Sequence, residues 1–480
     1  MNAPPHAVLI PYPTAGHLNP MLELAKLLHS KGFFITFVNT EFSHQQLLKT
    51  VGSDVMSAMN NLRFETIADG VSQSDSESPH HVFRVWFLIQ KNSPAPLRDL
   101  ILKLHSSSDL PPLTCIVTNF LMNFTRGVAE QLGVPELVFW TTSACGLMAS
   151  LQLGELIRRG FVPLKDEGCL TNGYLDITVD WIPGMREMRL RDLSSFIRTT
   201  NHDDILVKTE MEEVDYASKA WGVILNTFDD MEREVLGALR SFFPRIYTLG
   251  ALGELVDQIG GGLMASTRLS VWREDRSCME WLDSQSEASV IYVSFGSLTV
   301  LTAHQLAEFA WGLAGTDHPF LWIIRPDMVD GGVRTALPEE FIAATKGRSF
   351  FASWCHQGQV LAHRSVGGFL THGGWNSMLE SVLSGVPLIC WPTFADQYTN
   401  CRYACAHWGF GLEVDQEVTR GQVSDRVREL MEGEKGKEMR ERSKKWKEMA
   451  KQATRRSGSS HMNLDRLAED LSIKETQSES

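Results

Sequence analysis

The most chemically informative feature of this 480-residue sequence is a glycine turn between an apolar run and a helical pattern. Residues 366–370 predict a buried strand, Thr371-His372-Gly373-Gly374 predicts a turn, and the helical pattern begins at Trp375. At a helix start, several backbone N–H groups lack partners and the helix dipole is positive, so an anion is stabilised there. The two glycines let the backbone approach such a ligand closely. The segment therefore predicts an anion-binding site.

Aromatic and polar residues with suitable chemistry lie on both sides of this turn. Trp354 offers a flat face on which a base can stack. Glu380 follows Asn376 by four residues and shares its helix face, and its carboxylate suits a pair of hydroxyl groups. A second apolar run is followed by the polar pair Asp396-Gln397.

Residues 354–397 resemble, over their whole length, the signature box of plant family 1 UDP-dependent glycosyltransferases, which use UDP-sugars. The alternative, an ordinary βαβ unit with packing residues only, would require every one of these residues to be incidental, so we reject it. The resemblance assigns Trp354 to uracil stacking. It assigns the Cys355 backbone and Gln357 to the uracil edge or ribose, and Glu380 to the ribose hydroxyls. It assigns the diphosphate to His372, Gly374, Trp375, Asn376 and Ser377, and the sugar hydroxyls to Asp396 and Gln397.

Two positions refine this expectation. The family has Gln at the position of Gln397 mainly when the donor carries glucose, so UDP-glucose is the expected donor, with galactose and xylose donors left open. His356 stands where the family usually has Pro, which would alter the local turn without removing a donor ligand. The resemblance implies no metal and no cofactor beyond the donor, and the sequence offers no metal-ligand cluster.

The composition indicates an ordinary globular protein of two domains. The chain is 43% hydrophobic, enough for packed cores. Its formal net charge of −13 disfavours nucleic acid as a partner. The eight cysteines lack metal-ligand spacing and are expected to be reduced thiols. No apolar run is long enough to span a membrane and no basic signal-peptide region is present, so we expect a cytoplasmic protein without membrane insertion. The oligomeric state is open, and a monomer is the default expectation.

Hydrophobic periodicity predicts two α/β halves. A strand at 7–11, a turn at 14–20, a helix at 18–30 and a strand at 33–38 form a βαβ opening, which implies a parallel sheet. Further strands are expected at 115–118, 136–140, 222–226, 245–249, 290–294, 320–324, 349–351, 366–370 and 386–391. Helices are expected near 277–283, 426–453 and 463–471.

The resembling family has the α/β fold called GT-B, in which two Rossmann-like, doubly wound domains face each other across a cleft. Ligands are then expected at the carboxyl ends of strands. The expected organisation is an N-terminal acceptor-binding domain at 1–250, a glycine-containing linker at 251–270, a C-terminal UDP-sugar-binding domain at 271–460, a helix at 461–473 packed back on the N-terminal domain, and a disordered tail at 474–480.

A histidine just past the first strand is the candidate general base. His17 alone would more often be a turn residue, but residues 13–20 look like the family motif whose His deprotonates the acceptor, a role that suits a neutral imidazole. In the family, an Asp at the end of another strand hydrogen-bonds this His. The matching stretch here, residues 115–120, has Asn119 followed by Phe120 instead.

This departure leaves three interpretations open, because Asn carries no charge and can select the wrong imidazole tautomer. The enzyme could prefer acidic acceptors that need little help, another carboxylate could replace the Asp, or the protein could bind UDP-sugar and turn over slowly. We favour a working enzyme with weakened base assistance. The resemblance implies in-line displacement with inversion to a β-glucoside. It also implies that Ser297 and the helix start stabilise departing UDP and that Thr141 reaches the sugar, although Thr141 fits equally well as a helix N-cap.

The acceptor site is the least defined part of the prediction. The expected lining residues are aromatic or apolar and come from the first domain: Phe83, Trp86, Phe87, Phe120, Leu121, Trp140, Met148, Leu151 and Met185. Each is more often a core residue; Phe120 is the best individual candidate because it would narrow the site beside His17. We expect a UDP-glucosyltransferase that acts on a small apolar plant metabolite. The alternatives are a non-catalytic UDP-sugar-binding protein and another GT-B activity such as epimerisation.

Overall fold

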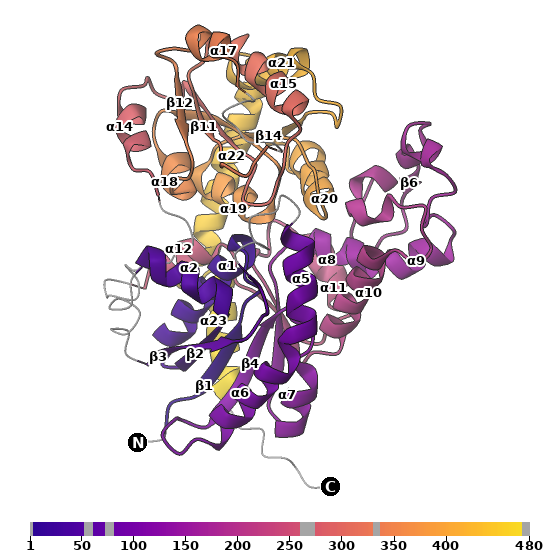
Figure 1. The fold of residues 1–480 in the computed structure, drawn as a ribbon, viewed down its shortest axis with the longest axis vertical. Helices are drawn as coiled ribbons and strands as arrows, with labels where there is room; N and C mark the ends of the chain where they lie inside the picture. Colours follow the sequence, from indigo (N-terminus) through magenta and orange to yellow (C-terminus); the bar gives the residue numbers. More distant parts are fainter. Residues whose placement is uncertain (1–2, 52–60, 73–80, 260–273, 330–336, 473–480) are drawn as a thin grey trace.

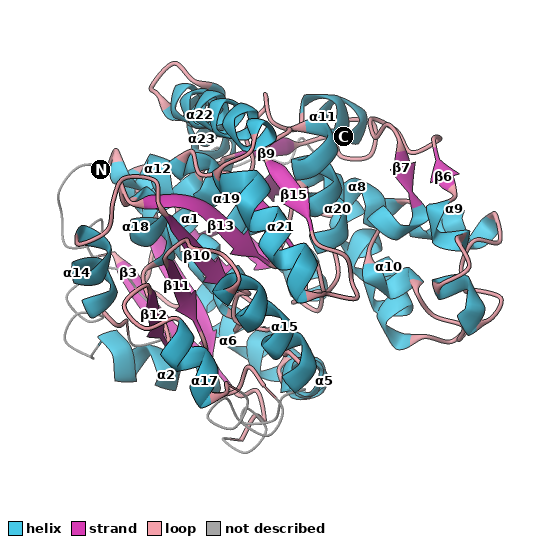
Figure 2. Ribbon diagram, turned by 90° about the horizontal axis from the view of Figure 1, so that it is seen from above, coloured by secondary structure: helices cyan, strands magenta, loops and turns pink. Residues whose placement is uncertain are grey.

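Two parallel β-sheets dominate the computed structural model, which describes residues 3–51, 61–72, 81–259, 274–329 and 337–472. Figure 1 shows them in two halves of the molecule, one above the other, with the N-terminal sheet in the lower half. Seen from above, helices surround the strands of the upper sheet (Figure 2). This arrangement confirms the predicted α/β class.

The N-terminal sheet has seven strands in the order β3-β2-β1-β4-β5-β8-β9, all parallel. Their bounds are β1 His6–Ile10, β2 Phe34–Thr40, β3 Leu62–Ile67, β4 Leu113–Asn119, β5 Glu136–Trp140, β8 Gly222–Leu225 and β9 Ile246–Thr248. The helices of this half are α1 Ala15–Ser30, α2 Glu41–Val51, α5 His81–Asn92, α6 Pro94–Ser106, α7 Arg126–Leu132, α8 Ala144–Leu151, α9 Leu153–Arg158, α10 Ile205–Ser218, α11 Arg233–Leu239 and α12 Leu252–Asp257. A short antiparallel pair, β6 Thr178–Val179 and β7 Met188–Arg189, lies between α9 and α10 in sequence.

The C-terminal sheet has six parallel strands in the order β12-β11-β10-β13-β14-β15. Their bounds are β10 Val290–Ser294, β11 Phe320–Ile323, β12 Ser349–Ala352, β13 Val366–Thr371, β14 Leu388–Cys390 and β15 Gly411–Glu413. Its helices are α14 Ser277–Asp283, α15 Ala303–Ala314, α17 Glu339–Ala344, α18 Gln357–Ala362, α19 Trp375–Ser384, α20 Gln397–Arg402, α21 Arg420–Met431 and α22 Glu434–Thr454.

The two halves share buried apolar surface. One cluster of buried side chains runs from Trp140 in the N-terminal half to Trp375 and Trp408 in the C-terminal half. The last helix, α23 Ser459–Ser472, lies in the lower half (Figure 1), where Leu464 and Leu467 share a buried core with strands of the N-terminal sheet. Burial of this kind contributes about 25 cal/mol for each Å² of apolar surface removed from water, so α23 is held in the same core as β1.

Several predicted elements differ from the structure. The segment 14–20 is not wholly a turn, because α1 begins at Ala15 and so contains His17. The predicted helix 426–453 is two helices, α21 and α22, separated near Gly433. The predicted linker begins with a helix, α12, whose Leu252 and Leu255 are buried in the N-terminal core, and residues 260–270 of that linker lie outside the described residues. The predicted disordered tail, residues 474–480, also lies outside the described residues.

Candidate active site

The predicted anion site forms where two neighbouring C-terminal strands end. β10 and β13 are paired with Ser294 opposite Thr371, so the loop that carries Ser297 lies beside the turn that carries His372. His372 is packed between glycines: a Cβ placed on Gly296 would lie 2.6 Å from its Nε2, and one on Gly374 would lie 2.5 Å from it. Gly296 also has a φ of +73°. The φ of Gly296 favours glycine there, and the close approach at both positions means that any side chain would displace the His372 ring.

A buried arginine that the sequence analysis missed organises this turn. Arg325 follows β11, is only 2% exposed, and donates hydrogen bonds to the carbonyl oxygens of Gly296 and Thr299. Burial, and then the charge of Arg325, lower the pKa of His372 to about 4, so this imidazole is neutral near pH 7. The sequence position of Arg325 could have identified it, because a charged residue just after a parallel strand lies at the edge of the sheet where ligands bind.

Gln357, Ser377 and Glu380 come together at the expected ribose end. Gln357 Nε2 donates to Glu380 Oε2 at 2.5 Å and to Ser377 Oγ at 2.9 Å, while Gln357 Oε1 accepts from the Tyr292 hydroxyl at 3.3 Å. Burial raises the pKa of Glu380 to about 7, against a smaller opposing effect of the Gln357 hydrogen bond. The Glu380 carboxyl therefore changes its charge in the neutral pH range.

We expect UDP-glucose affinity to fall as the pH drops below 7. In the expected role of Glu380, the ionised carboxylate would accept from two ribose hydroxyls, whereas the protonated carboxyl keeps one oxygen as a donor, so the dissociation constant should rise by up to about tenfold per pH unit. Calorimetric titration from pH 8 to pH 5 measures this. Glu380→Gln is the matched control: it should bind more weakly at pH 8 and lose the change centred near pH 7. A profile with an unchanged midpoint in Glu380→Gln would contradict the assignment.

At the end of the site where the sugar is expected, Gln397 and Asp396 each make hydrogen bonds within the protein and keep further hydrogen-bonding capacity. Gln397 Oε1 accepts from the backbone N–H groups of Thr393 and Phe394, at 2.9 Å and 3.1 Å, which leaves its amide nitrogen to donate. Asp396 Oδ2 accepts from Asn400 Nδ2 at 2.9 Å. Burial raises the pKa of Asp396 to about 6. These are groups suited to sugar hydroxyls: one acidic acceptor and one amide donor.

The side chains of Trp375 and His356 are held by other parts of the fold. The Trp375 indole is buried and donates from Nε1 to the Asn226 carbonyl at 2.8 Å, so only its backbone at the start of α19 is available to a phosphate. His356 caps α18, because its Nδ1 accepts from the Gln359 N–H at 3.1 Å. Trp354 is partly exposed. The His356 substitution thus supplies a helix cap where proline would not.

Helix α19 is hydrogen-bonded directly to the first turn of α1, which carries His17. Asn376, in the first turn of α19, donates from Nδ2 to the Gly16 carbonyl at 2.7 Å. That carbonyl would ordinarily accept from the N–H four residues later in α1, but residue 20 is proline and has none. Pro20 therefore leaves an acceptor free at the position where the two halves of the site meet.

His17 is held at one ring nitrogen. Its Nδ1 lies 2.7 Å from Thr141 Oγ1 and 3.1 Å from Asn119 Nδ2. Loss of water around the imidazole lowers the pKa of His17 to about 4. Among the residues that the structure describes, no carboxylate forms an ion pair with His17, so a replacement for the missing Asp is not found there. The N-cap of α8 is Ser143, which accepts from Gly146 N–H, so the alternative N-cap role for Thr141 is wrong.

Aromatic side chains enclose the space next to His17. Phe120 stacks on Trp140 with ring centroids 4.1 Å apart, and its own centroid is 5.6 Å from the imidazole. Tyr12, which the sequence analysis did not single out, lies edge-on to His17 at 5.6 Å. Trp86 is partly buried against the neighbouring apolar cluster. Of the other expected lining residues, Met148 and Met185 are fully buried core residues.

A second aromatic group joins the two halves. Phe394, two residues before Asp396, contacts Phe83 of α5 at 6.0 Å and Phe196 at 5.3 Å between ring centroids. Phe83 and Phe87 are exposed, at 44% and 60%. Phe394 and Phe196 were missed by the sequence analysis, because only the folded chain brings these segments together.

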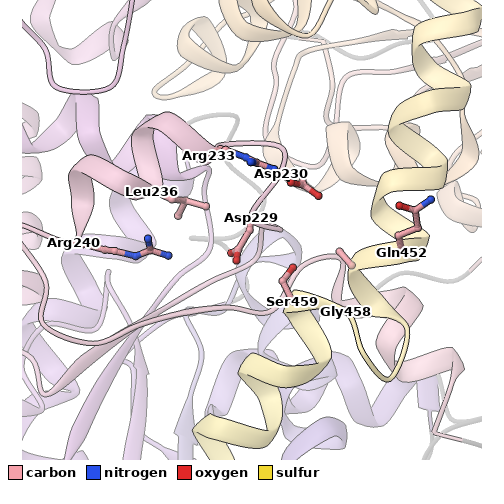
Figure 3. A pocket seen from close by; sticks show the side chains of 9 residues that line it. Asp229, Asp230, Arg233, Leu236, Arg240, Gln452, Gly458 and Ser459 are labelled. Atoms are coloured by element: carbon pink, nitrogen blue, oxygen red, sulfur yellow. Dashed lines mark hydrogen bonds and ion pairs between the residues drawn. The ribbon is translucent and has the colours of Figure 1, made fainter.

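A cavity of about 440 Å³ lies elsewhere, between α11 and the junction of α22 with α23 (Figure 3). It shares no residue with the site described above: its lining is Asp229, Asp230, Arg233, Leu236, Arg240, Gln452, Ala453, Gly458 and Ser459. Within the described residues, no group of three or more His, Cys, Asp or Glu side chains is arranged to hold a metal ion. None of the described helices is both long and apolar enough to cross a lipid bilayer.

Sequence comparison relates the chain to sugar-transfer enzymes. The family model described as UDP-glucoronosyl and UDP-glucosyl transferase matches residues 20–443. A 7-deoxyloganetin glucosyltransferase from Catharanthus roseus is 48% identical over 473 residues, which cover 98% of this chain and 97% of the relative. An (R)-mandelonitrile beta-glucosyltransferase from Prunus dulcis is 49% identical over 465 residues, or 96% of each chain.

Solved structures show the same fold. A UDP-glucosyltransferase from Polygonum tinctorium capable of glucosylating indoxyl superposes with a TM-score of 0.80 at 29% identity, covering 99% of this chain and 100% of that one. A Phytolacca americana glycosyltransferase complexed with UDP-2fluoro-glucose and pterostilbene has a TM-score of 0.80 at 26% identity, covering 98% and 100%. The predicted GT-B architecture is therefore confirmed.

Proposed function

Because the chain belongs to the UDP-glucoronosyl and UDP-glucosyl transferase family, we propose that it moves glucose from UDP-glucose to a hydroxyl or carboxyl group of a small apolar metabolite, with inversion to a β-glucoside. The observation that carries this proposal is the contact between Asn376 and the Gly16 carbonyl, which brings the start of the donor helix next to His17. Such proximity is what transfer between a bound donor and a bound acceptor needs.

The proposed reaction is a single displacement. His17 Nε2 takes the proton of the acceptor hydroxyl as the oxygen attacks the anomeric carbon from the face opposite UDP. The bond to UDP breaks, and the negative charge that develops on the β-phosphate is stabilised by Ser297, neutral His372 and the N–H groups at the start of α19. Asp396 and Gln397 hold the sugar hydroxyls.

The surroundings of His17 support a preference for acidic acceptors. An imidazole with a pKa of about 4 is a weak base, and no carboxylate among the described residues pairs with it to stabilise the imidazolium. Proton transfer is then easiest from phenols, carboxylic acids and hydroxyls made acidic by neighbouring groups. The relative named for (R)-mandelonitrile supports such an acceptor class, since the hydroxyl of that molecule is next to a nitrile.

The test is acceptor-dependent release of UDP from UDP-glucose. The purified chain is incubated with a panel of phenols, carboxylic acids and terpene alcohols, and the anomeric configuration of each product is read by NMR. We expect turnover that is fastest with the most acidic acceptors and gives β-glucosides. No turnover across the panel while UDP-glucose still binds, or α-linked products, would contradict the proposal.

A further inference from the structure

The Nδ1 atom of His17 has two hydrogen-bonding neighbours with different capacities. Asn119 Nδ2 lies 3.1 Å from it and Thr141 Oγ1 lies 2.7 Å from it. A neutral imidazole carries one proton, on either Nδ1 or Nε2. Nε2 can accept a proton from the acceptor only when Nδ1 carries the ring proton, so the groups around Nδ1 decide whether His17 is a base.

The Asn119 amide presents a donor to His17. Its Oδ1 accepts the backbone N–H of Leu121 at 3.1 Å, which fixes the carbonyl side of the amide away from the imidazole. A flipped amide would place NH₂ against that N–H and leave both groups without acceptors, and Asn119 is fully buried. Its Nδ2 therefore points to Nδ1 and to Thr141 Oγ1, which is 3.2 Å away.

Asn119 alone would thus favour the unproductive tautomer, with Nδ1 as an acceptor and the proton on Nε2. Thr141 removes this conflict, because a hydroxyl oxygen has two lone pairs. The second lone pair of Oγ1, which lies 2.7 Å from Nδ1, can accept Nδ1–H of His17 while the first accepts Nδ2–H of Asn119. The threonine proton is then left to donate to a third group, such as an oxygen of the bound sugar.

We propose that Thr141 is the positioning residue that keeps His17 in the productive tautomer, so that Asn119, Thr141 and His17 form an uncharged substitute for the family's Asp–His pair. The inference rests on the proposed function and extends it by naming the group that orients the base. It also explains how a chain with Asn119 remains active: the tautomer is preserved, and only the stabilising negative charge is lost. The missing charge accounts for the preference for acidic acceptors.

The test compares Thr141→Val in two backgrounds. Valine keeps the shape but cannot accept Nδ1–H. With Asn119 present, kcat should fall about 100-fold, within the range of general-base contributions. With Asn119→Asp, the carboxylate accepts Nδ1–H itself, and Thr141→Val should lower kcat less than about threefold. Thr141→Ser is the matched control and should stay close to the parent in both backgrounds. If the threonine hydroxyl also binds the sugar, its removal raises the KM for UDP-glucose equally in both backgrounds.

A second measurement reads the tautomer without turnover. The ¹⁵N chemical shifts of His17 in the UDP-bound protein, labelled on histidine, tell which ring nitrogen carries the proton. We expect it on Nδ1 in the wild type and on Nε2 in Thr141→Val. An equal loss of kcat in both backgrounds, or a wild-type proton on Nε2, would overturn the inference. If the wild type turns over no acceptor, the proposed function fails separately, and the NMR result still decides the role of Thr141.

Discussion

Replacing His17 with alanine is expected to lower kcat/KM for the acceptor by about a thousandfold while UDP-glucose binding stays unchanged. His17 lies in the N-terminal half, where the acceptor is expected, and Phe120 and Tyr12 pack around its ring. Most of the groups expected to bind the donor come from the C-terminal sheet. The substitution removes the proton acceptor and leaves the donor site intact. Initial rates of UDP release give the first quantity, and calorimetry with UDP-glucose gives the second.

His29→Gln is a suitable control, because His29 lies in the last turn of the same helix, α1. Its substitution should leave the rate near the wild-type value and shows whether α1 tolerates the loss of an imidazole. Acceptor-dependent release that persists in His17→Ala at more than about a tenth of the wild-type rate would rule out His17 as the base. Loss of UDP-glucose binding together with activity would instead indicate that the N-terminal turn has collapsed.

The elements expected to bind the donor could be predicted because their residues are consecutive in sequence. Residues 366–377 are expected to form a strand, a glycine turn and a helix, and the structure has β13, the turn and α19 there. β5 and β10 have the predicted bounds. Short apolar runs in a parallel sheet are buried on both faces, so local composition is sufficient to find them.

Contacts between the halves could not be predicted in the same way. The Asn376 bond to Gly16 depends on a carbonyl that Pro20 leaves free within a helix, yet the sequence pattern places Pro20 in a turn. Pro20 lies in the second turn of α1, where it removes one helical hydrogen bond, the bond from residue 20 to the Gly16 carbonyl, and α1 continues past it to Ser30. Arg325 and Phe394 were missed for the related reason that their partners are distant in sequence.

Asn119→Asp is expected to raise kcat on weakly acidic alcohols by about ten- to a hundredfold, the effect of about 1.5–3 kcal/mol from a hydrogen bond to a charged group. The new carboxylate accepts Nδ1–H of His17 in place of the Thr141 hydroxyl and stabilises the imidazolium that forms as the proton transfers. Phenols and carboxylic acids should gain little, because their deprotonation needs less help. Rates are compared over the acceptor panel at saturating UDP-glucose.

The pH profile distinguishes this electrostatic effect from a simple change of packing. A carboxylate favours the charged imidazole, so the pKa of His17 should rise from its present value of about 4, and the acid limb of kcat/KM for the acceptor should move upward with it. Asn119→Leu removes the amide without adding charge and should show neither the gain nor the shift. Equal gains for alcohols and phenols, or a gain in Asn119→Leu, would mean that the side chain at position 119 acts by changing the shape of the acceptor site. An acid limb that moves only in Asn119→Asp, together with a gain confined to alcohols, would mean that the missing charge sets the acceptor range of this enzyme.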